Sequence, residues 1–65
     1  MKIYLNGKTV ETDVGTLFAL FEECGIDPTC VASAVNGNFV PRREYSTFNL
    51  YEDAKIEVLS PMQGG

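Results

Sequence analysis

The sequence predicts an α+β fold, in which a mixed sheet of four to five strands packs on one main helix. Two Asn-Gly pairs, each between short runs of apolar residues, predict two β-hairpins. An apolar stripe at helical spacing between the hairpins predicts one helix, and alternating apolar residues near the C-terminal end predict a last strand. The chain has 65 residues, enough for one domain, and one sheet on one helix is the smallest two-layer arrangement for that length.

The first hairpin is predicted by the stretch KIYLNGKTVE. Asn6-Gly7 is a favoured pair for a two-residue turn with positive φ at both positions. Apolar and polar residues alternate before this turn, so one face of the first strand is apolar. The first strand is expected near residues 2–5 and the second near residues 8–12.

The helix is predicted by the stretch TLFALFEECG. Its apolar residues fall at positions i, i+3, i+4 and i+7 and form one stripe, namely Leu17, Leu20, Phe21 and Cys24. Thr16 or Asp13 is expected to cap the start of the helix, and Gly25 suits a left-handed residue at its end. The position of Cys24 on the stripe indicates that this side chain packs in the core.

The second hairpin is predicted by VASAVNGNFV, which turns on Asn36-Gly37. Both faces of residues 31–35 carry small or apolar side chains, which leaves open the question of which face meets the helix. Pro41 is expected to end this hairpin or to place its second strand at an edge of the sheet. The next residues, 42–54, are expected to be irregular with a short helical turn.

The last strand is predicted at residues 55–59, with Ile56 and Val58 facing the core. The first and last strands both carry strong apolar patterns, so they are expected to pair at the centre of the sheet. This arrangement is the β-grasp. A folded domain is therefore expected over residues 1–59, followed by a flexible C-terminal tail at residues 60–65.

The composition argues against several classes of function. The net charge is −4, from nine acidic and five basic residues, so nucleic acid and anionic membrane surfaces are disfavoured as partners. A basic protein surface suits the chain better. No apolar run is long enough for a signal peptide or a membrane span, so a cytoplasmic protein is expected. The chain is also expected to be a monomer in the absence of its partners.

The residue types present are poorly suited to catalysis by this chain. The sequence has no His, which is the commonest general base and the commonest metal ligand, so no catalytic or metal site is expected. Cys24 and Cys30 do not have a zinc-site spacing, and no disulfide is expected between them in a reducing compartment. Cys24 is expected to be a packing residue, and Cys30 has no neighbouring cation in the sequence to activate it as a relay thiol.

The C-terminal end PMQGG is the candidate reactive segment. Two residues without Cβ atoms can enter a narrow cleft with any φ, and the Gly65 carboxylate is unhindered. A carboxylate becomes a good electrophile once it is transferred to AMP, but the chain has no glycine-rich phosphate loop to carry out that transfer. The sequence therefore predicts a protein substrate of a partner enzyme, with Gly64 recognised in the cleft of the partner. Pro61, Met62 and Gln63 are either recognised by the same cleft or form a passive spacer.

The stretch AVNGNFVPRREY, followed by AKIEVLSPMQGG, resembles the ThiS family, the sulfur carriers of thiamine biosynthesis. The resemblance covers essentially the whole chain, since the N-terminal strand, the Asn-Gly hairpin, the VPR after it and the final Gly-Gly all fall where the family has them. The chain departs from the family at two places. Residues 52–54 are Glu-Asp-Ala where the family usually has Asp-Gly-Asp, and Ser33 replaces an apolar residue.

The resemblance implies a ubiquitin-like β-grasp fold and a defined set of partners. A ThiF-type activating enzyme is implied to adenylate the Gly65 carboxylate with ATP, so that the chain itself binds no cofactor. Sulfur from a cysteine desulfurase route is implied to give a C-terminal thiocarboxylate. Thiazole synthase is then implied to receive that sulfur for the thiazole part of thiamine.

A docking patch is the second candidate site. Tyr4 and Leu59 are expected to point away from the core, because their strand neighbours point inward. If the first and last strands pair, these two side chains form an apolar patch on the open face of the sheet, with Phe39 as a possible third member. Exposed apolar patches often mark protein contacts, although single exposed apolar residues are also normal.

Three alternative functions remain open from the sequence. The first is a sulfur carrier for another product, such as molybdopterin. The second is a ubiquitin-like modifier that is joined through Gly65 to lysines of target proteins. The third is a β-grasp binding module whose tail is inert.

Overall fold

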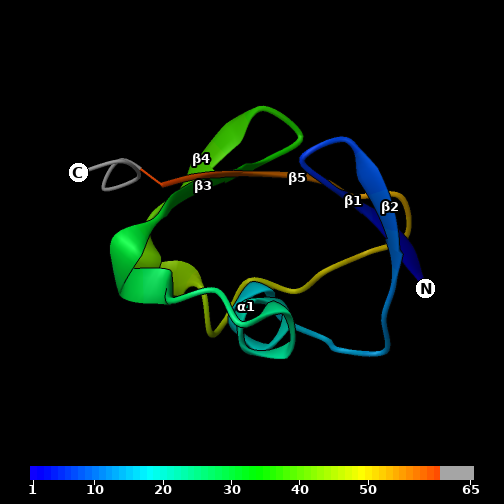
Figure 1. The fold of residues 1–65 in the computed structure, drawn as a ribbon, viewed down its shortest axis with the longest axis horizontal. Helices are drawn as coiled ribbons and strands as arrows, with labels where there is room; N and C mark the ends of the chain where they lie inside the picture. The colour runs from blue at the N-terminus through cyan, green and yellow to red at the C-terminus, as the bar shows by residue number, and fades with distance from the viewer. Residues whose placement is uncertain (61–65) are drawn as a thin grey trace.

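The computed structural model describes residues 1–60 and confirms the α+β prediction. Five strands form one sheet, and α1 lies against one face of it (Figure 1). The elements follow the order β1 (Lys2–Leu5), β2 (Lys8–Glu11), α1 (Leu17–Cys24), η1 (Pro28–Cys30), β3 (Ala32–Val35), β4 (Asn38–Val40), η2 (Arg42–Glu44) and β5 (Lys55–Leu59). The predicted elements are therefore all present, and the second strand ends one residue earlier than expected.

The sheet has the order β2-β1-β5-β3-β4, so the last strand lies at its centre. β5 runs parallel to β1 and antiparallel to β3, while each hairpin adds one antiparallel edge strand. The predicted central pairing of the first and last strands is confirmed. β4 ends at the residue before Pro41 and lies at an edge of the sheet. Proline has no backbone N–H, and at this place no hydrogen bond between strands is lost.

Both hairpins turn through Asn-Gly pairs, as predicted. Asn6 and Asn36 each have a φ of 51°, and the glycines that follow them have φ values of 85° and 82°. Positive φ at both positions matches the right-handed twist of the flanking strands. Asp53 also has a positive φ, 66°, in the turn where the family usually has glycine. Its backbone N–H donates to the carbonyl oxygen of Lys2 at 2.7 Å, which ties this turn to β1.

The helix α1 begins and ends at the predicted residues. The Thr16 hydroxyl accepts a hydrogen bond from the Ala19 N–H at 3.2 Å, so Thr16, and not Asp13, is the N-cap. Gly25 adopts the left-handed conformation with a φ of 73°, and the next N–H, from Ile26, donates to the carbonyl oxygen of Phe21 at 2.8 Å. The local sequence signals at the two ends are sufficient to position this helix.

The prediction that Cys24 packs in the core is wrong, because its side chain is exposed. The other three members of the stripe are fully buried, and they occupy the first five residues of the helix. Cys24 is the last helical residue, and the chain turns away at Gly25, so the fourth stripe position lies beyond the part of the helix that the sheet covers. Cys24 and Cys30 are both free thiols, as expected.

The core contains a residue from the irregular segment that the sequence pattern did not identify. Tyr45 is 2 % exposed, and its ring packs edge-on against Phe21 with 5.1 Å between the ring centroids. Its hydroxyl donates to the carbonyl oxygen of Val31 at 3.3 Å, so the buried polar group has a partner. The segment after η2 thereby closes the core beside α1. The buried apolar residues are Ile3, Leu17, Leu20, Phe21, Val35, Val40, Tyr45, Leu50, Ala54 and Ile56.

The open question about β3 is settled by burial. Ser33 and Val35 are 3 % and 2 % exposed and face α1, whereas Ala32 and Ala34 are only half-buried on the opposite face. The Ser33 hydroxyl has no hydrogen-bond partner in the described part of the chain. A buried hydroxyl without a partner loses its hydration without compensation, so this residue is a local weakness of the core.

We expect Ser33→Ala to raise the free energy of unfolding by about 1 kcal/mol, because the substitution removes an unpaired buried hydroxyl at little cost in volume. Urea denaturation of the two proteins measures this difference. Ser46→Ala, at an exposed position, is the matched control and should leave stability unchanged. A destabilised Ser33→Ala protein would contradict the prediction, since it would mean that the hydroxyl makes a favourable bond in solution.

Candidate functional site

The candidate reactive segment follows the central strand. Met62, Gln63, Gly64 and Gly65 lie outside the described residues, so their predicted roles remain predictions. The structure fixes the point from which this segment leaves the fold. β5 ends at Leu59, which pairs with Ala32 of β3, and the chain therefore continues from the end of a strand held in the middle of the sheet.

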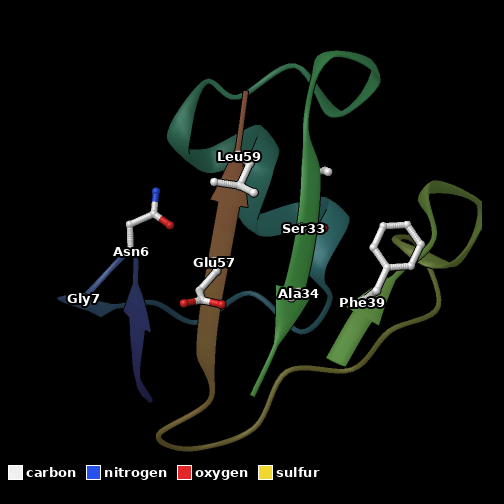
Figure 2. Close-up of a pocket in the computed structure, with 8 residues that line it drawn as sticks. Asn6, Gly7, Ser33, Ala34, Phe39, Glu57 and Leu59 are labelled. Atoms are coloured by element: carbon white, nitrogen blue, oxygen red, sulfur yellow. The ribbon is translucent and has the colours of Figure 1, made fainter. Parts of the chain in front are cut away.

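The open face of the sheet carries the two most exposed large apolar side chains of the described residues. Phe39 on β4 and Leu59 on β5 are each 70 % exposed, and both point away from α1 (Figure 2). Side chains alternate between the two faces of a strand, and Leu59 is therefore outward because Ile56 and Val58 pack inward. The outward direction predicted for Leu59 is confirmed, and Phe39 shares its face.

A groove of about 440 Å³ connects these two side chains. Its floor is the open face of the central strands, where the half-buried Ala32 and Ala34 leave room beside the larger residues. We name this surface the open-face groove, and its lining residues are Asn6, Gly7, Ala32, Ser33, Ala34, Phe39, Glu57 and Leu59 (Figure 2). Ser33 belongs to this lining although its side chain is buried on the opposite face of β3. The groove brings together residues from the first turn and from three strands.

Tyr4 does not line the open-face groove. It pairs with Lys55 at the start of β5, whereas Leu59 lies at the other end of the same strand. Tyr4 lines an adjoining hollow of about 200 Å³ that shares Gly7 and Glu57 with the groove. The Nζ of Lys2 lies 5.3 Å from the centre of the Tyr4 ring. The Tyr4 side chain, with a smaller contribution from Asp53, raises the pKa of Lys2 above its usual value. Tyr4 therefore has a cationic neighbour and lies beside the groove without lining it.

Glu57 is a groove residue that the sequence reasoning missed. It lies between Lys55 and Leu59 on the outward side of β5, and its neighbour on β3 is Ala34, which in turn pairs with Phe39. Figure 2 shows its carboxylate on the open face between the first turn and β3. The alternation that predicted Leu59 as outward also predicts Glu57 as outward, so the signal was present. The groove thus combines two exposed apolar side chains with one carboxylate.

Cys30 lies on an exposed turn away from this groove. Its thiol donates to the Asp27 carboxylate at 3.5 Å, and the same carboxylate accepts from the Thr29 N–H at 2.9 Å and the Thr29 hydroxyl at 2.7 Å. These bonds, led by the Thr29 hydroxyl, hold the pKa of Asp27 below its usual value. The anionic Asp27 opposes a thiolate at Cys30, whereas the Arg42 guanidinium, which donates to the Thr29 carbonyl oxygen at 3.2 Å, brings a cation to the same turn.

The described residues contain neither a metal-binding cluster nor a membrane-spanning helix. Among residues 1–60, no three His, Cys, Asp or Glu side chains gather closely enough to hold a metal ion. No helix in this range has the length and apolar character that crossing a membrane requires. The open-face groove and the end of β5 are therefore the features from which a site can be built.

Comparisons with known proteins agree with this architecture. The ThiS family model matches residues 3–65. The chain is similar to the crystal structure of the thiamine biosynthesis protein ThiS from Geobacter metallireducens, with 22% identity, a TM-score of 0.85 and 100% of both chains covered. It is also similar to the NMR solution structure of a thiamine biosynthesis protein from the same organism, with 22% identity, a TM-score of 0.78, and 100% of this chain and 88% of that chain covered. The comparison with curated proteins finds no match.

The structural similarity confirms the ubiquitin-like β-grasp fold, because it extends over the full length of the chain although few residues are identical. Both departures from the family pattern are accommodated within this fold. Asp53 takes the positive φ of the missing glycine, a conformation that Asp tolerates better than most residues, and Ser33 occupies a buried position on β3. Since the family match spans nearly the whole sequence, the chain belongs to the ThiS family.

Proposed function

We propose that this protein is a sulfur carrier of thiamine biosynthesis whose reactive atom is the carbonyl carbon of Gly65. The observation that carries the proposal is the family match, which spans residues 3–65 and so includes both terminal glycines. A ThiF-type enzyme adenylates the chain, a cysteine desulfurase route supplies sulfur, and thiazole synthase receives it. The chain acts as a protein substrate and leaves catalysis to these partners.

The chemistry of the proposal begins with the Gly65 carboxylate. A carboxylate oxygen attacks the α-phosphorus of ATP and pyrophosphate leaves, which gives a mixed anhydride with AMP. A sulfur nucleophile then attacks the carbonyl carbon, the bond to the AMP oxygen breaks, and AMP leaves with that electron pair. When the sulfur arrives as a persulfide, a second thiol must reduce the acyl disulfide before a thiocarboxylate is left.

The open-face groove is the surface that we propose for docking on the partners. Phe39 and Leu59 are exposed apolar side chains on a face that no described helix covers, and such patches are typical of protein contacts. Leu59 also lies at the end of β5, directly before the segment that leads to Gly65. Contacts at the groove would therefore hold the partner close to the reacting end of the chain.

The charge of the groove supports a partner surface with apolar and basic character. Glu57 lines the groove, and the whole chain has a net charge of −4. A cation opposite Glu57 would favour the correct partner and speed its association, while an acidic surface would be rejected. This complementarity agrees with the preference for a basic protein surface that the composition indicates.

We expect incubation with a ThiF-type enzyme, ATP and a sulfur source to replace one oxygen of the Gly65 carboxylate by sulfur. Intact mass spectrometry detects the gain, and fragmentation of the C-terminal peptide must place it on Gly65. This step is necessary because oxidation of a methionine or a cysteine gives nearly the same gain in mass. A chain without Gly65 is the control and should show no exchange.

The result has two clear readings. Exchange at Gly65 that is absent from the shortened chain supports the carrier proposal. If an enzyme proven active on another carrier produces no exchange, the proposal fails for that partner, and a search for conjugates between Gly65 and lysines would then test the modifier alternative.

We expect Leu59→Arg to weaken binding to the activating enzyme by about tenfold, a loss of about 1.4 kcal/mol, because it places a charge in an apolar contact. Calorimetric titration measures the binding. Cys24→Arg adds the same charge at an exposed site on α1, away from the groove, and is the matched control. Equal binding by both variants and the wild-type chain would remove the groove from the interface.

A further inference from the structure

The last residues of β5 have a neighbouring strand on one side only. β3 pairs with β5 as far as Ala32 opposite Leu59, but β1 pairs with β5 only as far as Leu5 opposite Ile56. The reason is the first hairpin, since the chain leaves β1 at the Asn-Gly turn. Alternate residues of a strand direct their N–H and C=O groups to opposite neighbours, and Val58 directs both groups to the side where β1 has ended.

The side chain of Asn6 occupies the place of the missing strand. Its Oδ1 accepts a hydrogen bond from the Val58 N–H at 2.8 Å, and its Nδ2 donates to the Val58 carbonyl oxygen at 3.3 Å. The backbone N–H of Asn6 donates to the carbonyl oxygen of Ile56 at 2.8 Å. Figure 2 shows Asn6 beside β5 on the side opposite β3. We name the two side-chain bonds the Asn6 clasp.

The second turn supplies a corresponding contact at the other end of β5. The Oδ1 of Asn36 accepts a hydrogen bond from the Lys55 N–H at 2.8 Å, and its Nδ2 donates to the Tyr51 hydroxyl at 2.8 Å. Asn36 has the same φ of 51° as Asn6 and also precedes a glycine. The two asparagines therefore have the same local role in their turns, and they differ in which end of β5 they hold.

We propose that Asn6 is a positioning residue for the reaction of Gly65. By bonding both backbone groups of Val58, the clasp fixes the direction in which the chain leaves the sheet beyond Leu59. Loss of the clasp leaves both backbone groups of Val58 without these partners, so fewer of the bound chains hold the exit strand in the arrangement from which the carboxylate reaches the α-phosphorus of ATP. This inference rests on the proposed function, because it concerns the same reaction.

The test compares Asn6→Gly with Asn36→Gly. Glycine accepts the positive φ of both turns without strain, so each variant loses the side-chain bonds while the turn is retained. Urea denaturation first confirms that both variants fold and are destabilised to a similar degree. Pyrophosphate release by a ThiF-type enzyme then gives kcat and KM with each chain as the substrate.

We expect Asn6→Gly to lower kcat by about tenfold, because the presentation of Gly65 suffers, with a smaller rise in KM, because Asn6 lines the open-face groove while Phe39 and Leu59 are unchanged. Asn36→Gly should keep the wild-type kcat. Asn6→Asp retains the acceptor for the Val58 N–H and tolerates the turn, so it should recover part of the lost kcat. Amide hydrogen exchange should show faster exchange at Val58 in Asn6→Gly than in Asn36→Gly.

Three results would overturn the proposal. An equal loss of kcat in the two glycine variants would make the effect one of stability alone. An unchanged kcat in Asn6→Gly would mean that the clasp has no part in the reaction, and a raised KM at constant kcat would make Asn6 a docking contact. Failure of the proposed function is a separate observation, because the wild-type chain would then release no pyrophosphate with an enzyme that is active on another carrier.

Discussion

The parallel pairing of β1 with β5 is the contact on which the rest of the structure depends. It joins the two ends of the domain, with Tyr4 opposite Lys55 and Leu5 opposite Ile56, and so places the last strand between the two hairpins. Ile3 and Ile56 are among the most buried residues of the core, and burial of such side chains is the main favourable term in folding. Without this pairing the first hairpin would be a separate two-stranded ribbon, and such ribbons are marginally stable in water.

The same pairing determines where the candidate site lies. A chain whose last strand is an edge strand would leave the sheet at that edge, whereas this chain leaves at the end of the central strand. The exposed Leu59 and the carboxylate of Glu57 precede the exit along one strand, and Phe39 lies across β3 from them. The surface proposed for docking and the segment proposed for reaction are therefore parts of one strand and its continuation.

The small size of the domain explains why its described residues cover only one face of the sheet. One helix and the segment around Tyr45 are enough to cover one face, and a chain of 65 residues has little left to cover the other. In the absence of a second covering layer, side chains from the turns stabilise the sheet by hydrogen bonds to its backbone. The turn asparagines Asn6 and Asn36 are examples, because each forms a tight turn and also bonds the backbone of β5.

The sequence by itself determined the elements, since hairpin turns, helix caps and side-chain alternation are set by neighbouring residues. The sequence also predicted that Leu59 points outward and that the first and last strands pair at the centre of the sheet. The terminal glycines predicted Gly65 as the reactive residue. Tertiary structure decided what depends on the packing of distant segments, including the burial of Tyr45, the exposure of Cys24 and the absence of Tyr4 from the lining of the groove. The physical reason is that periodicity fixes the face of an element on which a side chain lies, whereas only the packed fold fixes which part of that face is covered.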